Sequence, residues 1–184
     1  MPALESSPPI LAAAGPQQRW FAPLRALVFA QRAGSLTRHC LLVWPVALLP
    51  SLAMVSLVYG LLQLLGIDSS TFEPPTRRVT MGQVFSAVVF APLVETLVLG
   101  GGLWLLSRLS HRPVFVAAAS SVLWGCLHGV SGLIWFFGTF WSFYIFSCSY
   151  LAWRSSSWWR AYVVAAVPHA LINLTAMGLL SLQP

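Results

Sequence analysis

Charged residues are scarce in this sequence and make up only 8% of its 184 residues. Soluble domains usually carry about 25% charged residues, so the composition excludes an ordinary soluble domain. Hydrophobic residues account for 58% of the chain, and its mean hydropathy is +0.78. These values predict an all-α, polytopic membrane protein, in which a bundle of apolar helices crosses the bilayer.

Lysine is absent and there are four acidic residues, so the formal net charge of +6 comes from ten arginines. The arginines lie between the apolar runs, as expected for residues that flank membrane helices, and they do not indicate a nucleic-acid partner. Cysteine is also scarce, because Cys40, Cys126 and Cys148 are the only three and show no CxxC spacing. The sequence therefore predicts neither a disulfide framework nor a cysteine zinc site.

Five apolar segments are predicted to cross the membrane, since about 20 helical residues span a hydrocarbon core of ~30 Å. They cover residues 40–66, 83–106, 113–137, 138–153 and 161–182. Residues 1–18 are rich in proline and predict a disordered tail. Residues 19–38 mix arginines with apolar side chains, as in an amphipathic helix at the membrane surface. The predicted organisation is a tail with an interfacial helix over residues 1–39, then one transmembrane domain over residues 40–184.

The distribution of arginine predicts the orientation of these helices. With the N-terminus inside the cell, the inside segments contain eight arginines and the outside segments contain only Arg77 and Arg78. Basic residues favour the cytoplasmic side, so we expect a cytoplasmic N-terminus and an extracytoplasmic C-terminus. The use of arginine alone favours a bacterial source, which makes the plasma (inner) membrane the expected location.

Glu95 is the only acidic residue within a predicted membrane helix, and it lies near the middle of the run 83–106. A carboxylate at that depth costs about 2.5–3.5 kcal/mol on insertion scales, so it indicates a functional site with a partner. The alternative is a protonated glutamic acid that is hydrogen-bonded within the core.

Three further polar residues lie at a similar depth in other helices. His128 is in the third predicted span, and His169 and Asn173 are in the fifth. A spacing of four residues places His169 and Asn173 on one face of a helix. Lipid cannot satisfy these groups, so we expect them to meet Glu95 around one internal cavity. His39 and His111 lie at the predicted membrane edges and are interpreted as ordinary interfacial residues.

The chemistry of this set suits hydrolysis by an activated water. A carboxylate and an imidazole can remove a proton from a shared water. A second imidazole and an amide can then donate hydrogen bonds to the oxyanion that develops on a carbonyl oxygen. No cofactor is required, although two imidazoles and a carboxylate are also a familiar set of zinc ligands. The HExxH spacing of zinc peptidases is absent, and the residues alone leave the zinc alternative open.

The pattern of these residues resembles the CPBP family of intramembrane proteases, also called type II CAAX-prenyl-endopeptidase-like or abortive-infection proteins. That family carries an EExxxR helix, then FxxxH, then HxxxN. This sequence has Glu95-Thr96-x-x-x-Gly100, then Trp124-x-x-x-His128, then His169-x-x-x-Asn173, within residues 83–178. The resemblance implies that Glu95 and His128 activate the water, and that His169 and Asn173 stabilise the oxyanion.

The chain departs from the family pattern at two positions of the first motif. Thr96 replaces the second glutamate and Gly100 replaces the arginine, so one charge of each sign is lost and no unpaired charge is left. The three glycines at 100–102 allow close packing, and we expect a neighbouring helix or a substrate to occupy the place of the arginine.

The resemblance implies an intramembrane endopeptidase that acts on a membrane-anchored peptide or protein. Two alternatives remain open at this stage. One is a catalytically inactive relative that binds such a peptide as an immunity or maturation partner. The other is a membrane protein that handles haem or ions through His128 and His169, although this would leave Asn173 unexplained. The sequence does not indicate an oligomeric state.

Overall fold

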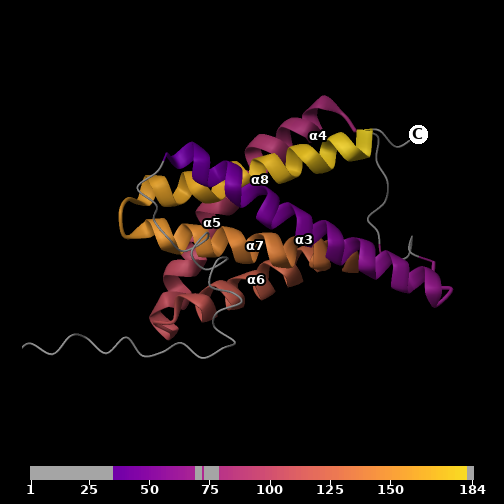
Figure 1. The fold of residues 1–184 in the computed structure, drawn as a ribbon, viewed down its shortest axis with the longest axis horizontal. Coiled ribbons are helices and arrows are strands. Elements are labelled where there is room, and N and C mark those ends of the chain that lie inside the picture. The colour runs from indigo at the N-terminus through magenta and orange to yellow at the C-terminus, as the bar shows by residue number, and fades with distance from the viewer. Residues whose placement is uncertain (1–34, 69–71, 73–78, 182–184) are drawn as a thin grey trace, which may run out of the picture.

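The computed structural model describes residues 35–68, 72 and 79–181, and this part of the chain is all-α, as predicted. It contains five helices, labelled as in Figure 1. They are α3 (Leu36–Leu64), a continuous helix formed by α4 (Met81–Phe85), η2 (Ser86–Phe90) and α5 (Ala91–Leu109), then α6 (Pro113–Gly129), α7 (Leu133–Arg154) and α8 (Trp158–Ser181). The predicted tail and nearly all of the predicted interfacial helix lie outside the described residues, as does most of the loop after α3.

Local sequence signals set the ends of these helices. The hydroxyl oxygen of Ser35 accepts a hydrogen bond from the backbone N–H of Arg38 at the start of α3. Thr80 and Gln83 form a reciprocal capping box at the start of α4, which satisfies two N–H groups that have no partner within the helix. Pro113 occupies the first turn of α6, where a missing N–H has no cost.

The predicted boundary between the third and fourth spans, at residues 137 and 138, is wrong. Helix α6 ends at Gly129 and α7 begins at Leu133, with a tight turn between them. Gly132 in this turn has φ 156°, and a Cβ there would lie 2.6 Å from the carbonyl oxygen of Phe72. The backbone at position 132 therefore suits glycine, and the turn falls several residues earlier than predicted.

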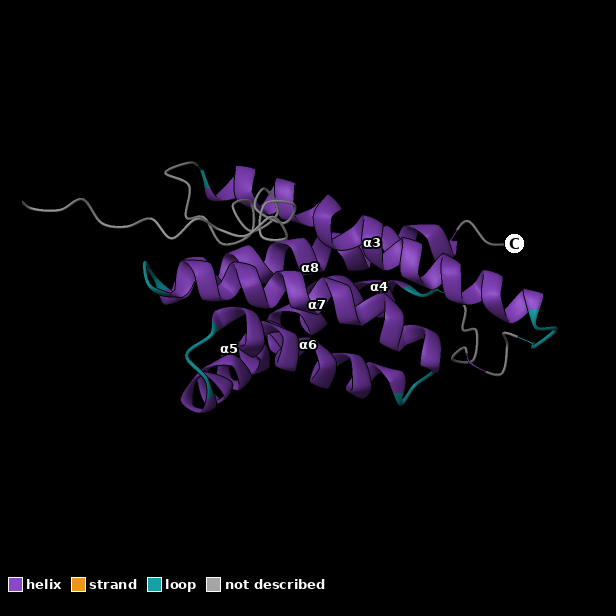
Figure 2. Ribbon diagram, turned by 60° about the horizontal axis from the view of Figure 1, so that its bottom comes forward, coloured by secondary structure: helices purple, strands orange, loops and turns teal. Residues whose placement is uncertain are grey.

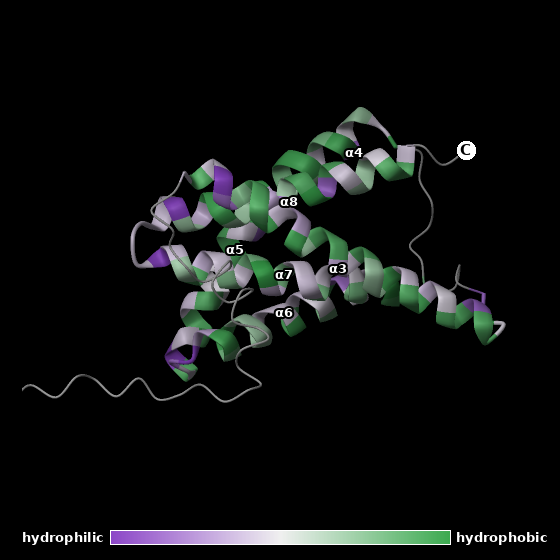
Figure 3. Ribbon diagram, in the orientation of Figure 1, coloured by the Kyte–Doolittle hydropathy of each residue, from purple (hydrophilic) through white to green (hydrophobic). Residues whose placement is uncertain are grey.

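Helix α7 lies at the centre of the bundle and packs against α3, α5, α6 and α8 (Figure 2). Its buried face carries Ser142, Ser147 and Ser149 together with large aromatic side chains. The outer surfaces of the other helices carry exposed leucine, valine and phenylalanine side chains, and Figure 3 shows how much of the ribbon is apolar. Small polar residues inside and large apolar residues outside are typical of helices that pack within a bilayer.

Three of the described helices are long and apolar enough to cross a membrane: Leu36–Leu64, Met81–Leu109 and Trp158–Ser181. These helices suggest a multi-pass membrane protein. Helix α6 is apolar but has only 17 residues, and α7 buries its serines inside the bundle.

A proline inside a helix frees a backbone carbonyl group, and at Pro50 a side chain from another helix binds this group. Pro50 lies inside α3 and has no N–H to donate to the carbonyl oxygen of Val46, four residues earlier. The indole N–H of Trp141 in α7 donates to this carbonyl at 2.9 Å. Such contacts are needed in an apolar environment, where no water is present to satisfy a free backbone group. This bond also fixes the position of α3 against α7.

The ends of the helices alternate between the two ends of the bundle. In Figure 1 the start of α3, the α5–α6 connection and the α7–α8 connection lie on the left, and the end of α8 lies on the right. Five described arginines belong to the left-hand segments: Arg38, Arg108, Arg112, Arg154 and Arg160. Figure 3 shows the hydrophilic colour concentrated at the same end.

This arrangement predicts that reporter domains fused before α3 and after α8 will lie on opposite sides of the membrane. A reporter inserted in the α6–α7 turn should lie on the same side as the C-terminal fusion, and one in the α7–α8 turn on the same side as the N-terminal fusion. Alkaline phosphatase and fluorescent-protein fusions provide the measurement. Both termini on one side would show that α6 and α7 do not cross separately.

Candidate active site

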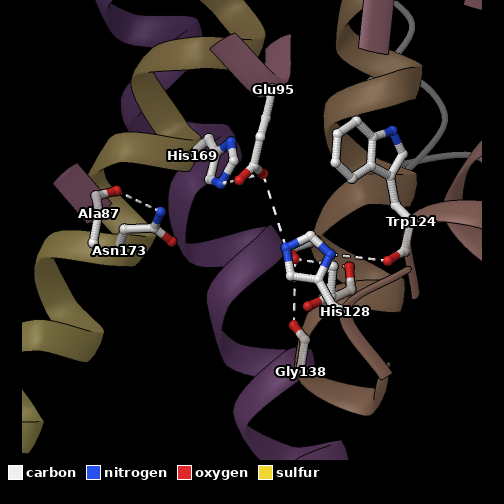
Figure 4. Close-up of polar contacts among 9 residues, drawn as sticks. Ala87, Glu95, Trp124, His128, Gly138, His169 and Asn173 are labelled. Atoms are coloured by element: carbon white, nitrogen blue, oxygen red, sulfur yellow. Dashed lines mark hydrogen bonds and ion pairs between the residues drawn. The ribbon is translucent and has the colours of Figure 1, made fainter. Parts of the chain in front are cut away.

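Glu95 lies in α5, a little more than one turn after a π-helical segment and three residues after Pro92. In η2 the backbone N–H of Ala91 donates to the carbonyl of Ser86, five residues earlier, and Pro92 follows directly. Segments of this kind change the rotation of a helix about its axis and are frequent at functional sites. The side chain of Glu95 is directed toward α6 and α8 (Figure 4).

The structure brings three of the four predicted site residues together. Oε2 of Glu95 lies 3.9 Å from Nε2 of His128 and 3.7 Å from Nε2 of His169. These distances exceed those of direct hydrogen bonds and are short enough for one bridging water. Oε2 is buried and accepts no hydrogen bond from any described residue. The side chains of Glu95 and His128 are 26% exposed, whereas that of His169 is only 7% exposed. The open side of the site is therefore the side of Glu95 and His128.

The backbone fixes the proton on one nitrogen of His128. Its Nδ1 lies 2.9 Å from the carbonyl oxygen of Trp124, one turn earlier in α6. A carbonyl only accepts, so Nδ1 must carry the hydrogen. In the neutral imidazole, Nε2 then presents a lone pair toward Glu95. An ionised carboxylate and this lone pair repel each other unless a proton or a water lies between them, and the gap of 3.9 Å suits such a bridge.

Aromatic side chains of α7 hold the two imidazole rings, and the sequence analysis did not single them out. The ring of Phe143 lies 5.6 Å from that of His128 and 5.1 Å from that of His169, and Phe146 stacks on His169 at 5.2 Å. A spacing of three residues places Phe143 and Phe146 on one face of α7. The sequence signal that could have predicted these contacts is this spacing of two phenylalanines in an uncharged part of the helix at the depth of the site.

Asn173 is placed differently from the other three residues. Its Nδ2 donates a hydrogen bond of 2.7 Å to the carbonyl oxygen of Ala87 in η2 (Figure 4). In an α-helix this carbonyl would accept from Ala91, but that N–H donates to Ser86 instead. The next residue, Pro92, has no N–H. Asn173 thus satisfies a carbonyl that the π-helix and the proline leave free, and one N–H of its amide remains for another acceptor.

A second side chain from α8 binds the same helix on the other side of His169. The hydroxyl of Tyr162 donates to the carbonyl oxygen of Leu93 at 2.8 Å. Tyr162 and Asn173 together hold α8 directly against η2 and α5. Because of this packing, His169 lies beside Glu95. The distance of 3.7 Å between Nε2 of His169 and Oε2 of Glu95 leaves no room for a substrate carbonyl between them in the resting structure.

Gly100 packs closely against a neighbouring helix, as predicted for the place of the family arginine. A Cβ on Gly100 would lie 2.6 Å from the hydroxyl oxygen of Tyr150 in α7, so only glycine fits there without a shift. Gly101 and Gly102 have no atom within 4 Å of the corresponding position. The side chain of Thr96 is buried, and neither Thr96 nor Gly100 carries a charge.

Across residues 35–68 and 79–181, no group of three His, Cys, Asp or Glu side chains has an arrangement that could hold a metal ion. Comparison with models of protein families, with characterised proteins and with solved structures finds no significant match to this chain. The case for a function therefore depends on the residues of the site themselves.

Replacement of Asn173 by leucine should destabilise the protein, because the carbonyl of Ala87 would be left without a donor. Leaving a buried backbone carbonyl unsatisfied costs about 1–3 kcal/mol. Reversible unfolding in mixed micelles measures this change. Thr175→Val is the matched control, because the hydroxyl of Thr175 bonds only within α8, to Leu171 at 2.8 Å. Equal stability of the two variants would show that the bond to Ala87 does not hold α8 in place.

Proposed function

We propose that this protein is an intramembrane endopeptidase that hydrolyses a peptide bond in a membrane-anchored peptide or protein. The observation that carries the proposal is the position of Oε2 of Glu95, within 4 Å of the Nε2 atoms of two histidines from different helices. A carboxylate among apolar helices requires such partners, and this set of groups suits the activation of a water. The resemblance of the three motifs to those of CPBP proteases points in the same direction.

In this proposal the nucleophilic water binds between Glu95 and His128, on the open side of the site. Glu95 takes a proton from the water while the oxygen of the water attacks the carbonyl carbon of the substrate. The imidazole of His128, with Nδ1–H held by Trp124, accepts the second hydrogen bond of the water through Nε2. The proton on Glu95 then passes to the nitrogen of the departing amine. The products are a carboxylic acid and an amine, and no covalent enzyme intermediate forms.

His169 and Asn173 are the proposed donors to the oxyanion. With a proton on Nε2, His169 at rest points this N–H toward the carboxylate, at 3.7 Å from Oε2. When Glu95 accepts the water's proton its negative charge disappears, and negative charge develops on the carbonyl oxygen of the substrate. The N–H of His169 is then attracted to the oxyanion more strongly than to Glu95. Stabilisation that appears only in the transition state accelerates the reaction. The second N–H of Asn173 can donate to the same oxygen.

The proposal includes the predicted membrane topology. In this proposal five helices cross the plasma membrane of a bacterium, with the N-terminus in the cytoplasm and the C-terminus outside. The five are α3, Met81–Leu109, α6, α7 and α8. Support comes from the five described arginines at one end of the bundle. The proposed partners are the lipid bilayer and a membrane-anchored substrate. No cofactor is needed, and no nucleic acid is expected to bind.

Two observations favour the alternative of a catalytically inactive protein that binds a membrane peptide. Asn173 already uses one N–H to bind Ala87 in the resting structure, and Thr96 and Gly100 lack the charges of the family pattern. Such a protein would act as an immunity or maturation partner by holding the peptide at the open side of the site. A change of Glu95 that keeps its shape separates the two functions.

Glu95→Gln should abolish turnover, because an amide cannot accept the proton of the water, while expression and folding should stay close to those of the unchanged protein. Quantitative comparison of membrane-anchored peptides in cells that make either form identifies substrates that accumulate uncut. The purified forms are then tested on the peptides found. Asp68→Asn, which removes a carboxylate outside the proposed site, should leave cleavage intact. Cleavage by Glu95→Gln at the unchanged rate would overturn the protease proposal, and peptide binding without cleavage by either form would favour the alternative.

Asn173→Ala should slow cleavage of the same peptide by about 10²–10³-fold if Asn173 donates to the oxyanion. The loss should appear in kcat, because the oxyanion exists only in the transition state. A rise in KM with an unchanged kcat would contradict this role and would leave Asn173 only as the residue that binds Ala87.

A further inference from the structure

A cavity on another face of α5 is not used by the proposed reaction. It has a volume of about 310 Å³ and begins at Thr96, the neighbour of Glu95, but contains neither Glu95 nor the two histidines. Gly101 forms its floor, because no atom lies within 4 Å of the place where a Cβ would be, and Gly100, Trp104 and Trp158 also line it. The volume is at the lower end of the range for ligand sites, about 300–1,000 Å³.

The cavity runs from the interior of the bundle toward one end of it. Thr96, Gly100 and Trp104 follow one another at four-residue intervals along α5, which corresponds to about 12 Å of helix. Trp158 is the first residue of α8 and Arg154 is the last of α7, so both lie where these helices end. The inner part of the cavity is therefore at the depth of lipid chains and its mouth at the depth of lipid headgroups. Tryptophan and arginine are typical of that interface.

The mouth of the cavity carries positive charge. One guanidinium nitrogen of Arg154 donates to the hydroxyl of Ser107 at 3.3 Å, and a guanidinium has five N–H groups in all. A second cation is close by, because the guanidinium carbon of Arg108 lies 4.4 Å from the centre of the Trp104 ring. This stacking holds Arg108 against the wall of the cavity. The lining changes from an apolar floor to a cationic mouth, and this order matches an amphiphile with an apolar chain and an anionic headgroup.

We propose that this cavity binds an anionic glycerophospholipid of the surrounding leaflet. The phosphate lies at Arg154, near Arg108, and the glycerol and the first methylene groups of one chain lie over Gly101. Basic pockets between membrane helices are known to bind anionic headgroups in this way. The lipid would link the end of α7 to α5 and α8, and its binding does not require Glu95 to be a catalytic residue.

The test measures binding of phosphatidylglycerol and of phosphatidylcholine to the purified protein in a neutral detergent, by native mass spectrometry and by the shift in Tm. Phosphatidylglycerol should bind more tightly and raise the Tm more. Arg154→Gln should weaken its binding about tenfold or more, because charged groups form the stronger hydrogen bonds. Gly101→Leu should do the same by filling the cavity.

Two matched variants serve as controls. Arg112→Gln removes an arginine of the same end of the bundle that does not line the cavity, and Gly102→Leu adds the same side chain one residue away. Both variants should keep the preference for phosphatidylglycerol. Glu95→Gln should keep it too, so lipid binding is tested independently of the protease proposal. Equal losses in Arg154→Gln and Arg112→Gln would overturn the site in favour of general surface charge. An equal Tm shift with glycerol 3-phosphate would overturn the lipid as the ligand.

Discussion

The contact between one half-buried carboxylate and two imidazoles is the interaction on which the rest of the structure depends. Glu95 has no other acidic residue near it in the sequence, and its Oε2 lies 3.7 Å and 3.9 Å from the two Nε2 atoms. A carboxylate among apolar helices is costly unless partners of this kind surround it. Because His128 and His169 belong to α6 and α8, the same contact requires three helices to meet at one depth. The aromatic rings of α7 complete the site by holding both imidazoles.

Prolines contribute to this arrangement because each one removes a backbone N–H group. Each proline leaves a backbone carbonyl without its usual donor, and a bilayer offers no water in its place. Trp141 binds the carbonyl that Pro50 frees in α3. Asn173 binds the carbonyl of Ala87, which η2 and Pro92 leave free. The bonds join helices that are far apart in the sequence, and the second one involves Asn173, one turn of α8 after His169. Local irregularity of the backbone is thereby converted into specific contacts between helices.

The position of each polar group along its helix could be predicted from the sequence, and its direction could not. Apolar runs of known length give the position of Glu95 and His169 along their helices, and lipid forces such groups to meet. The sequence contains no comparable signal for the rotation of each helix about its axis, because these helices are apolar on most faces. For this reason the bond of Asn173 to η2 and the contacts of Phe143 were not foreseen. The turn at Gly132 was misplaced because hydropathy hardly changes across it, whereas a close backbone contact decides it.

A structure of the protein in a lipid nanodisc, at a resolution that shows ordered water, tests the central claim most directly. The account predicts a water within hydrogen-bond distance of both the carboxylate of Glu95 and Nε2 of His128, with His169 beside the same carboxylate. It also predicts that this water is reached from the side on which Glu95 and His128 are exposed. A separation of more than about 10 Å between Glu95 and both imidazoles, beyond the reach of one bridging water, would contradict the account.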